Sequence, residues 1–240
     1  MTRTITVKGV GTATVKPDFV ILSLSVEARN EDYEKAMQEA AHKIETLQTA
    51  IQTVGYDKTD LKTTNFNVRT DYESKKDRNG NYRSVFVGYV CSYRLTLSFD
   101  FENTRLSRTL TAIAAREVNP EMRIAFTVKN PSEINEELLR SATENAKRKA
   151  EILCSASGET LGSLLTIDYN WGEINVVSQT RYDLDECMPM MAASEKCMPE
   201  IEPDDINASD TATFVWEISW RKGRCNYDRS NHRRHCWVSF

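Results

Sequence analysis

The segment from residue 85 to residue 99 constrains the fold more than any other part of the chain. Strand side chains alternate between the two faces of a sheet, so an apolar period of two predicts a long, half-buried strand. Asn79-Gly80 lies before the segment and favours a tight type I′ turn. Residues 61–72 alternate in the same way, so we predict a β-hairpin over residues 61–99. The residues of the alternation are Val85, Val87, Tyr89, Cys91, Tyr93, Leu95, Leu97 and Phe99.

The same period of two predicts strands elsewhere in the chain. Residues 4–15 and 20–27 both alternate, and Lys16-Pro17-Asp18 between them has the composition of a turn. We therefore predict a second hairpin at the start of the chain. Further alternating segments predict strands at residues 121–129, 163–171 and 211–220.

Three segments instead repeat their apolar residues at spacings of three and four, which is typical of amphipathic helices. The first follows Asn30, a candidate N-cap, and ends near Gly55, which suits the residue after a helix. The second covers residues 103–117. The third begins at Pro131-Ser132 and ends near Gly158.

The predicted order is β-β-α-β-β-α-β-α-β-β. Hairpins with helices between them indicate an α+β fold, with antiparallel sheet and helices packed on one face. Residues 1–220 form one domain in this interpretation, with two lobes at 1–100 and 101–220 as an alternative. We expect residues 172–210 to be a flexible loop rich in Met, Pro and acids, and the basic segment 221–240 to be disordered.

The distribution of charge along the chain limits which classes of partner it can bind. The chain has 35 acidic and 31 basic residues, but its last twenty residues alone carry a net +5, which leaves −9 on residues 1–220. Such an acidic body repels phosphate backbones, so we do not expect a nucleic-acid partner, and only the tail could contribute to one. The sequence contains no run of about 18 apolar residues, so it predicts no membrane-spanning helix.

The start of the chain and its cysteines bear on location. The first twenty residues lack the apolar centre of a signal peptide, which predicts a cytoplasmic protein, or an exported one whose leader was removed. The six cysteines are scattered, which fits reduced thiols rather than a disulfide framework.

Five sequence motifs occur in an order that resembles the SIMPL-domain family, over residues 4–220. Its bacterial members include periplasmic and oxidative-stress-linked proteins. The resemblance implies an α+β fold that self-associates, in some members into ring- or channel-like assemblies, and it implies neither catalytic residues nor a cofactor. The motifs are ITVKGVGTATVKPD at 5–18, GY at 55–56 with LKTTNFNV at 61–68, GYVCSYRLTL at 88–97, ATENAKRKAEILCSASGETLG at 142–162 and PEIEPDD at 199–205.

Catalytic patterns are hard to find in the sequence. His42 falls on the polar side of the first helix, and the other two histidines lie in the tail, so no Ser-His-Asp or Cys-His arrangement is indicated. Gly9-Val10-Gly11 falls within one predicted strand rather than between a strand and a helix. We therefore interpret it as a bulge or a close backbone contact and not as a phosphate loop.

Two segments carry possible metal donors. Thioethers and thiolates between residues 187 and 199 would suit Cu(I), although a mobile loop or an oxidised Cys187–Cys197 pair explains them as well. The Cu(I) candidates are Cys187, Met188, Met190, Met191, Cys197 and Met198. The tail carries donor types that suit zinc, but their spacing does not favour a tetrahedral site. These are Cys225, His232, His235 and Cys236.

Several predicted strands have bulky residues on both faces, and intrachain helices can cover only one face. The pairs are Ile21 with Leu22, Phe86 with Val87, Val90 with Cys91 and Val215 with Trp216. Either intrachain packing of two sheets or subunit contacts would cover the second face. We therefore expect a non-enzymatic homo-oligomer without a cofactor, acting as a scaffold or binding module with a role in stress. The alternatives are a Cu(I)-binding protein and a hydrolase that uses carboxylates in a cleft.

Overall fold

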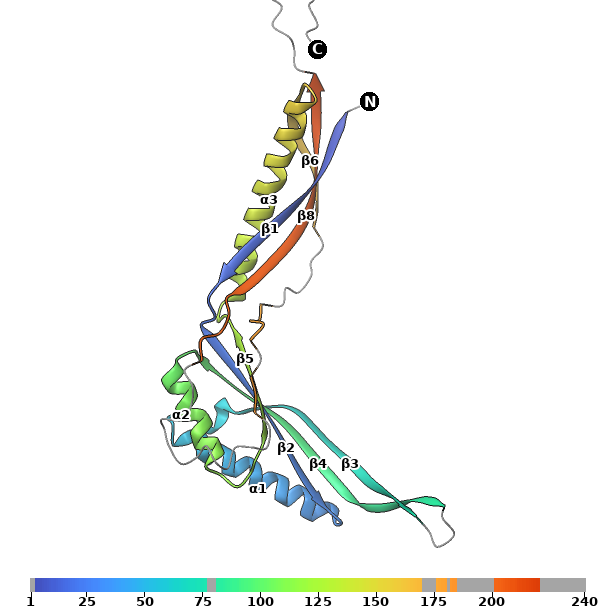
Figure 1. Ribbon diagram of the computed structural model, residues 1–240, viewed down its shortest axis with the longest axis vertical. Coiled ribbons are helices and arrows are strands. Elements are labelled where there is room, and N and C mark those ends of the chain that lie inside the picture. Colours follow the sequence, from blue (N-terminus) through green and yellow to red (C-terminus); the bar gives the residue numbers. More distant parts are fainter. Residues whose placement is uncertain (1–2, 77–80, 170–175, 181, 185–200, 221–240) are drawn as a thin grey trace, which may run out of the picture. The chain divides into compact units, whose positions relative to one another are not determined.

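The computed structural model describes residues 3–76, 81–169, 176–180, 182–184 and 201–220 (Figure 1). The chain divides into two compact units, and neither is one continuous stretch of sequence. Unit 1 contains residues 1–13, 132–174 and 208–240, and unit 2 contains residues 14–131 and 175–207. These ranges differ from the consecutive lobes 1–100 and 101–220 considered above, because the last strand returns to the first one.

Unit 2 contains an antiparallel sheet with the strand order β3-β4-β2-β5-β7 (Figure 1). The strand β3 pairs with residues 82–96 of β4, which confirms the hairpin predicted over residues 61–99. The turn at Asn79-Gly80 lies outside the described residues. The bounds are Phe19–Asn30 for β2, Lys62–Lys76 for β3, Tyr82–Asp100 for β4, Glu121–Thr127 for β5 and Tyr182–Leu184 for β7.

Two helices cover one face of this sheet, as predicted. The helix α1 spans Tyr33–Gln52, and α2 spans Asn103–Ala114. The even-numbered residues of β2 from Val20 to Val26 are buried against them, together with neighbours on β4 and β5. The other face of the sheet carries the odd-numbered residues of β2, which include Glu27 and Arg29.

Unit 1 contains a smaller sheet with the order β1-β8-β6, and the helix α3 packs on one of its faces (Figure 1). The packing is close at Gly9 and Gly11, where an added Cβ would overlap the carbonyl oxygens of Ala142 and Leu138. The glycines therefore serve a close backbone contact, one of the two interpretations given above. The bounds are Thr4–Val15 for β1, Ile206–Trp220 for β8, Glu159–Tyr169 for β6 and Pro131–Ala156 for α3.

The hairpin predicted between residues 4–15 and 20–27 is wrong. The strands β1 and β2 both exist, but they belong to different sheets. The turn residue Asp18 explains this: its N–H donates to the carbonyl of Thr127, and its carbonyl accepts from the N–H of Phe101. Since neighbours in unit 2 use both backbone groups, β2 enters its sheet without folding back onto β1.

Smaller differences concern the ends of elements. The N-cap of α1 is Asp32 and not Asn30, because the Asp32 carboxylate accepts from the N–H groups of Glu34 and Lys35. Asn30 is the last residue of β2. The short strand β7 lies within the segment 172–210, and the sequence analysis missed it.

Candidate functional site

The metal donors predicted from the sequence cannot be placed. The six Cu(I) candidates at 187–198 and the tail residues Cys225, His232, His235 and Cys236 all lie outside the described residues. Within the described ranges, no three His, Cys, Asp or Glu side chains gather closely enough to hold a metal ion. Cys91 and Cys154 are buried free thiols, and His42 is exposed as predicted.

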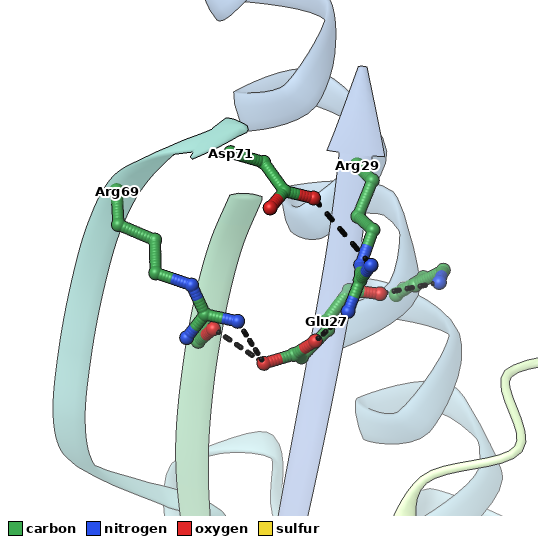
Figure 2. A network of polar contacts seen from close by, with 6 residues as sticks. Glu27, Arg29, Arg69 and Asp71 are labelled. Atoms are coloured by element: carbon green, nitrogen blue, oxygen red, sulfur yellow. Dashed lines mark hydrogen bonds and ion pairs between the residues drawn. The ribbon is translucent and has the colours of Figure 1, made fainter. Parts of the chain in front are cut away.

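A network of charged side chains lies on the uncovered face of the sheet in unit 2 (Figure 2). The Arg29 guanidinium of β2 lies 3.3 Å from the Glu27 carboxylate and 3.6 Å from that of Asp71 on β3. Arg69 on β3 reaches Glu27 at 3.5 Å, and the Ser92 hydroxyl of β4 donates to Glu27 at 3.0 Å. The network therefore connects three neighbouring strands through one carboxylate.

The electrostatics of this network keep Glu27 ionised. Burial works to raise the pKa of its carboxyl group, but the Ser92 hydrogen bond and the guanidinium groups of Arg29 and Arg69 outweigh it. The pKa of Glu27 therefore lies below its ordinary value. A carboxylate with a lowered pKa is a weak base, so the hydrogen bond to Glu27 does not activate the Ser92 hydroxyl as a nucleophile.

The charged side chains of the network connect neighbouring strands to one another. Two guanidinium groups face two carboxylates, so its charge is balanced internally. All four side chains are at least 36% exposed, and exposed ion pairs contribute about 0–1 kcal/mol each. We interpret the network as a device that favours the correct register of β2, β3 and β4, and not as a ligand site.

A row of aromatic rings lies along the β3–β4 hairpin and reaches the start of α1. Tyr33 packs on Tyr89 at 5.5 Å between ring centroids, Tyr89 on Phe86 at 5.3 Å, and Phe86 on Tyr72 at 5.7 Å. All three contacts are edge-to-face. Tyr33, Tyr72 and Phe86 are 48%, 55% and 44% exposed. We call these four residues the aromatic row, and large exposed apolar groups of this kind mark interaction surfaces.

A second group of exposed apolar residues lies on β6 in unit 1. Leu164, Leu165 and Ile167 are 44%, 49% and 55% exposed. The strand is at the end of its sheet, and its pairing with β8 shifts register on both sides of Leu164. Other strand residues within the described ranges are exposed as well, among them Phe66 and Tyr82 on the hairpin and Trp220 at the end of β8.

The residue pairs predicted to place bulky side chains on both faces of a strand differ in how far the structure buries them. Val90 and Cys91 are both buried, whereas Ile21 and Val215 are half-buried beside buried partners. Only Phe86 in these pairs is exposed. The apolar surface that these pairs leave exposed is therefore on the hairpin, and it is not spread over every strand.

Comparison with known proteins decides the relationship. The family described as SIMPL, protein of unknown function, matches residues 5–216. The chain belongs to the SIMPL family. This match confirms the resemblance drawn from the five motifs, and the SIMPL region includes every described helix and all of the described strands except Thr4 of β1 and residues 217–220 of β8.

Two curated relatives of this SIMPL chain are similar in sequence. Over 163 residues it is 29% identical to the 26 kDa periplasmic immunogenic protein of Brucella melitensis and 28% identical to the protein of the same name from Brucella abortus. The aligned region covers 68% of this chain and 65% of each relative. The chain thus spans just under two thirds of the length of the curated relatives it matches. None of its described helices is long and apolar enough to cross a membrane.

Sequence reasoning missed both the charged network and the aromatic row. The network required the pairing of β2 with β4 and of β4 with β3, which brings Glu27, Ser92 and Arg69 together from separate strands. The sequence did contain one signal for the network. Charged side chains occur at alternate positions of two predicted strands, and they predict cross-strand pairs once a register is assumed.

Proposed function

We propose that this SIMPL protein is a non-enzymatic scaffold that assembles with further copies of itself. The observation that carries the proposal is the aromatic row on the β3–β4 hairpin. Three of its rings are about half exposed, and edge-to-face contacts hold all four in a fixed arrangement. Aromatic side chains bury a large area at a small entropic cost, so they dominate the energetics of protein interfaces.

Charge also supports assembly over a nucleic-acid partner. The chain carries a net −4, and its arginines at the charged network are already paired with Glu27 and Asp71. A surface of this kind offers a phosphate backbone little attraction.

The test is the native mass of the full chain, measured by size-exclusion chromatography with light scattering over a range of concentrations. We expect a discrete oligomer for the unmodified chain and a smaller species for the Tyr72→Ser, Phe86→Ser double variant. Phe66→Ser is the matched control, because Phe66 is 47% exposed on the same hairpin but lies outside the row. A strict monomer at every concentration would overturn the proposal.

The stress role and the cellular location belong to the same proposal. The names of the two Brucella relatives favour the periplasm over the cytoplasm, which subcellular fractionation of the native host tests directly. We propose that the assembled form of the protein acts in the stress response. A deletion strain complemented with the double variant should then remain as sensitive to peroxide as the deletion strain, and full protection by the variant would contradict this link.

A further inference from the structure

The two edges of the sheet in unit 1 differ in how their backbone groups are used. At the β1 edge, side chains of α3 accept from the strand: Val10 N–H donates to Asn145 at 3.1 Å, and Thr12 N–H to Ser141 at 3.3 Å. Lys149 donates to the Lys8 carbonyl at 3.2 Å. The helix therefore blocks this edge against pairing with another chain.

The opposite edge is formed by β6 and lacks such protection. No further strand pairs with β6 among the residues that the structure describes. Exposed edges are usually protected by lysine, proline, β-bulges or inward-pointing charges. The two register shifts beside Leu164 are the protection of this kind that β6 has. The segment 159–169 contains no lysine, arginine or proline, and of its two acids Glu159 is buried in an ion pair with Arg3. An edge strand with exposed Leu164, Leu165 and Ile167 offers both backbone groups and apolar side chains to a partner.

We infer that β6 pairs antiparallel with β6 of a second copy, around a two-fold axis through Leu164. This inference rests on the proposed self-association and names one of its contacts. An isologous contact requires that a surface fit its own copy. In this register Leu164 faces its own copy, and Leu161 faces Ile167 of the partner subunit. These three residues lie opposite β8 residues Trp216, Ile218 and Phe214, so they share the apolar side of the strand.

The charges on β6 fit the same register. Asp168 faces Thr160 of the partner subunit, and Glu159 faces Tyr169 of the partner subunit, so neither acid faces another acid. Like charges directly opposite each other destabilise a strand pair, and this arrangement avoids them. A parallel, in-register pair would instead align each acid with its copy. The distribution of charge is therefore compatible with the antiparallel pair of two identical strands.

Cross-linking tests the register. In a chain whose Cys187, Cys197, Cys225 and Cys236 are changed to serine, Leu164→Cys should form a disulfide-linked dimer under mild oxidation. Directly opposed strand positions have Cβ atoms about 4.5–5.5 Å apart, close to the range that a disulfide needs. Ile152→Cys is the matched control, because Ile152 is 59% exposed on α3 of the same unit. Cross-linking of both variants to the same extent would overturn the inference.

Native mass then separates failure of this inference from failure of the proposed function. The Leu164→Lys, Ile167→Lys double variant places charge on the edge and should lower the native mass at least two-fold, while circular dichroism stays unchanged. If the mass stays unchanged while the aromatic-row variant still lowers it, the β6 pairing is wrong and self-association stands. If the unmodified chain is monomeric and does not cross-link, both are wrong.

Discussion

Replacement of Gly9 by alanine tests the packing of β1 against α3. The added Cβ would lie 2.8 Å from the Cβ of Ala146 and would overlap the Ala142 carbonyl oxygen. Carbon and oxygen atoms need a separation near 3.5 Å, so α3 has to move from β1 by roughly 1 Å. The helix contributes its own backbone atoms to the clash, and no rotation of a side chain relieves it.

The expected loss of unfolding free energy follows from the contacts that such a shift would break. Overpacking of a close contact costs about 1–3 kcal/mol. The hydrogen bonds from Val10 to Asn145 and from Thr12 to Ser141 both cross the same gap, and each contributes about 1 kcal/mol. We therefore expect Gly9→Ala to lower the unfolding free energy of unit 1 by about 3–5 kcal/mol.

The control is Gly158→Ala, because nothing lies within 4 Å of its added Cβ and only its φ of +76° opposes the change. A left-handed alanine costs about 1–2 kcal/mol, and the lost freedom of the unfolded chain offsets part of that. Urea unfolding followed by tryptophan fluorescence suits the comparison, since all four tryptophans fall within the sequence ranges of unit 1. Equal losses for the two variants would refute the close contact.

Three further predictions address other parts of the chain. Arg3→Ala removes the partner 2.7 Å from the buried Glu159 carboxylate, but Arg3 itself is 49% exposed, so stability should fall by about 1–3 kcal/mol in thermal unfolding and largely return when Glu159→Gln is added. Glu27→Gln should destabilise unit 2 above pH 4.5, and its difference from the unmodified chain should shrink as the pH falls through the lowered pKa of Glu27; a difference that does not shrink as the pH is lowered from 4.5 would contradict the assignment. Cu(I) titration of the reduced chain tests the soft-donor alternative, which predicts a lower stoichiometry when Cys187 and Cys197 are changed to serine.

The order of helices and strands, apart from the short strand β7, was predictable because the apolar residues of each element repeat with the period of a helix or of a strand. The alternation along β4 and the helical spacing in α1 depend on residues that are close in sequence. The sheet to which β1 belongs was not predictable, because β1 pairs with β8, about two hundred residues away. A turn such as Lys16-Pro17-Asp18 fixes a change of direction, and it does not determine which strand becomes the neighbour.

The hairpin shows why the aromatic row was missed. A strict period of two places Val85 and Val87 on the same face as Tyr89. In the structure the pairing shifts by one residue between Asp71 and Tyr72, beside Gly88, whose φ is +154°. A one-residue shift moves every later side chain to the other face. Phe86 therefore joins Tyr89 and Tyr72 in one row, a placement that alternation alone assigns to the opposite face.

The two proposed contacts have different consequences for the size of the assembly. The pairing of β6 with its own copy closes after two chains, because an isologous contact uses the same surface on both partners. The aromatic row lies on the other unit, so the two contacts do not use the same side chains. A native mass of two chains for the aromatic-row variant, and of more than two for the unmodified chain, is therefore expected only if both contacts operate. An unmodified chain that stops at two copies would contradict the joining of dimers through a second contact.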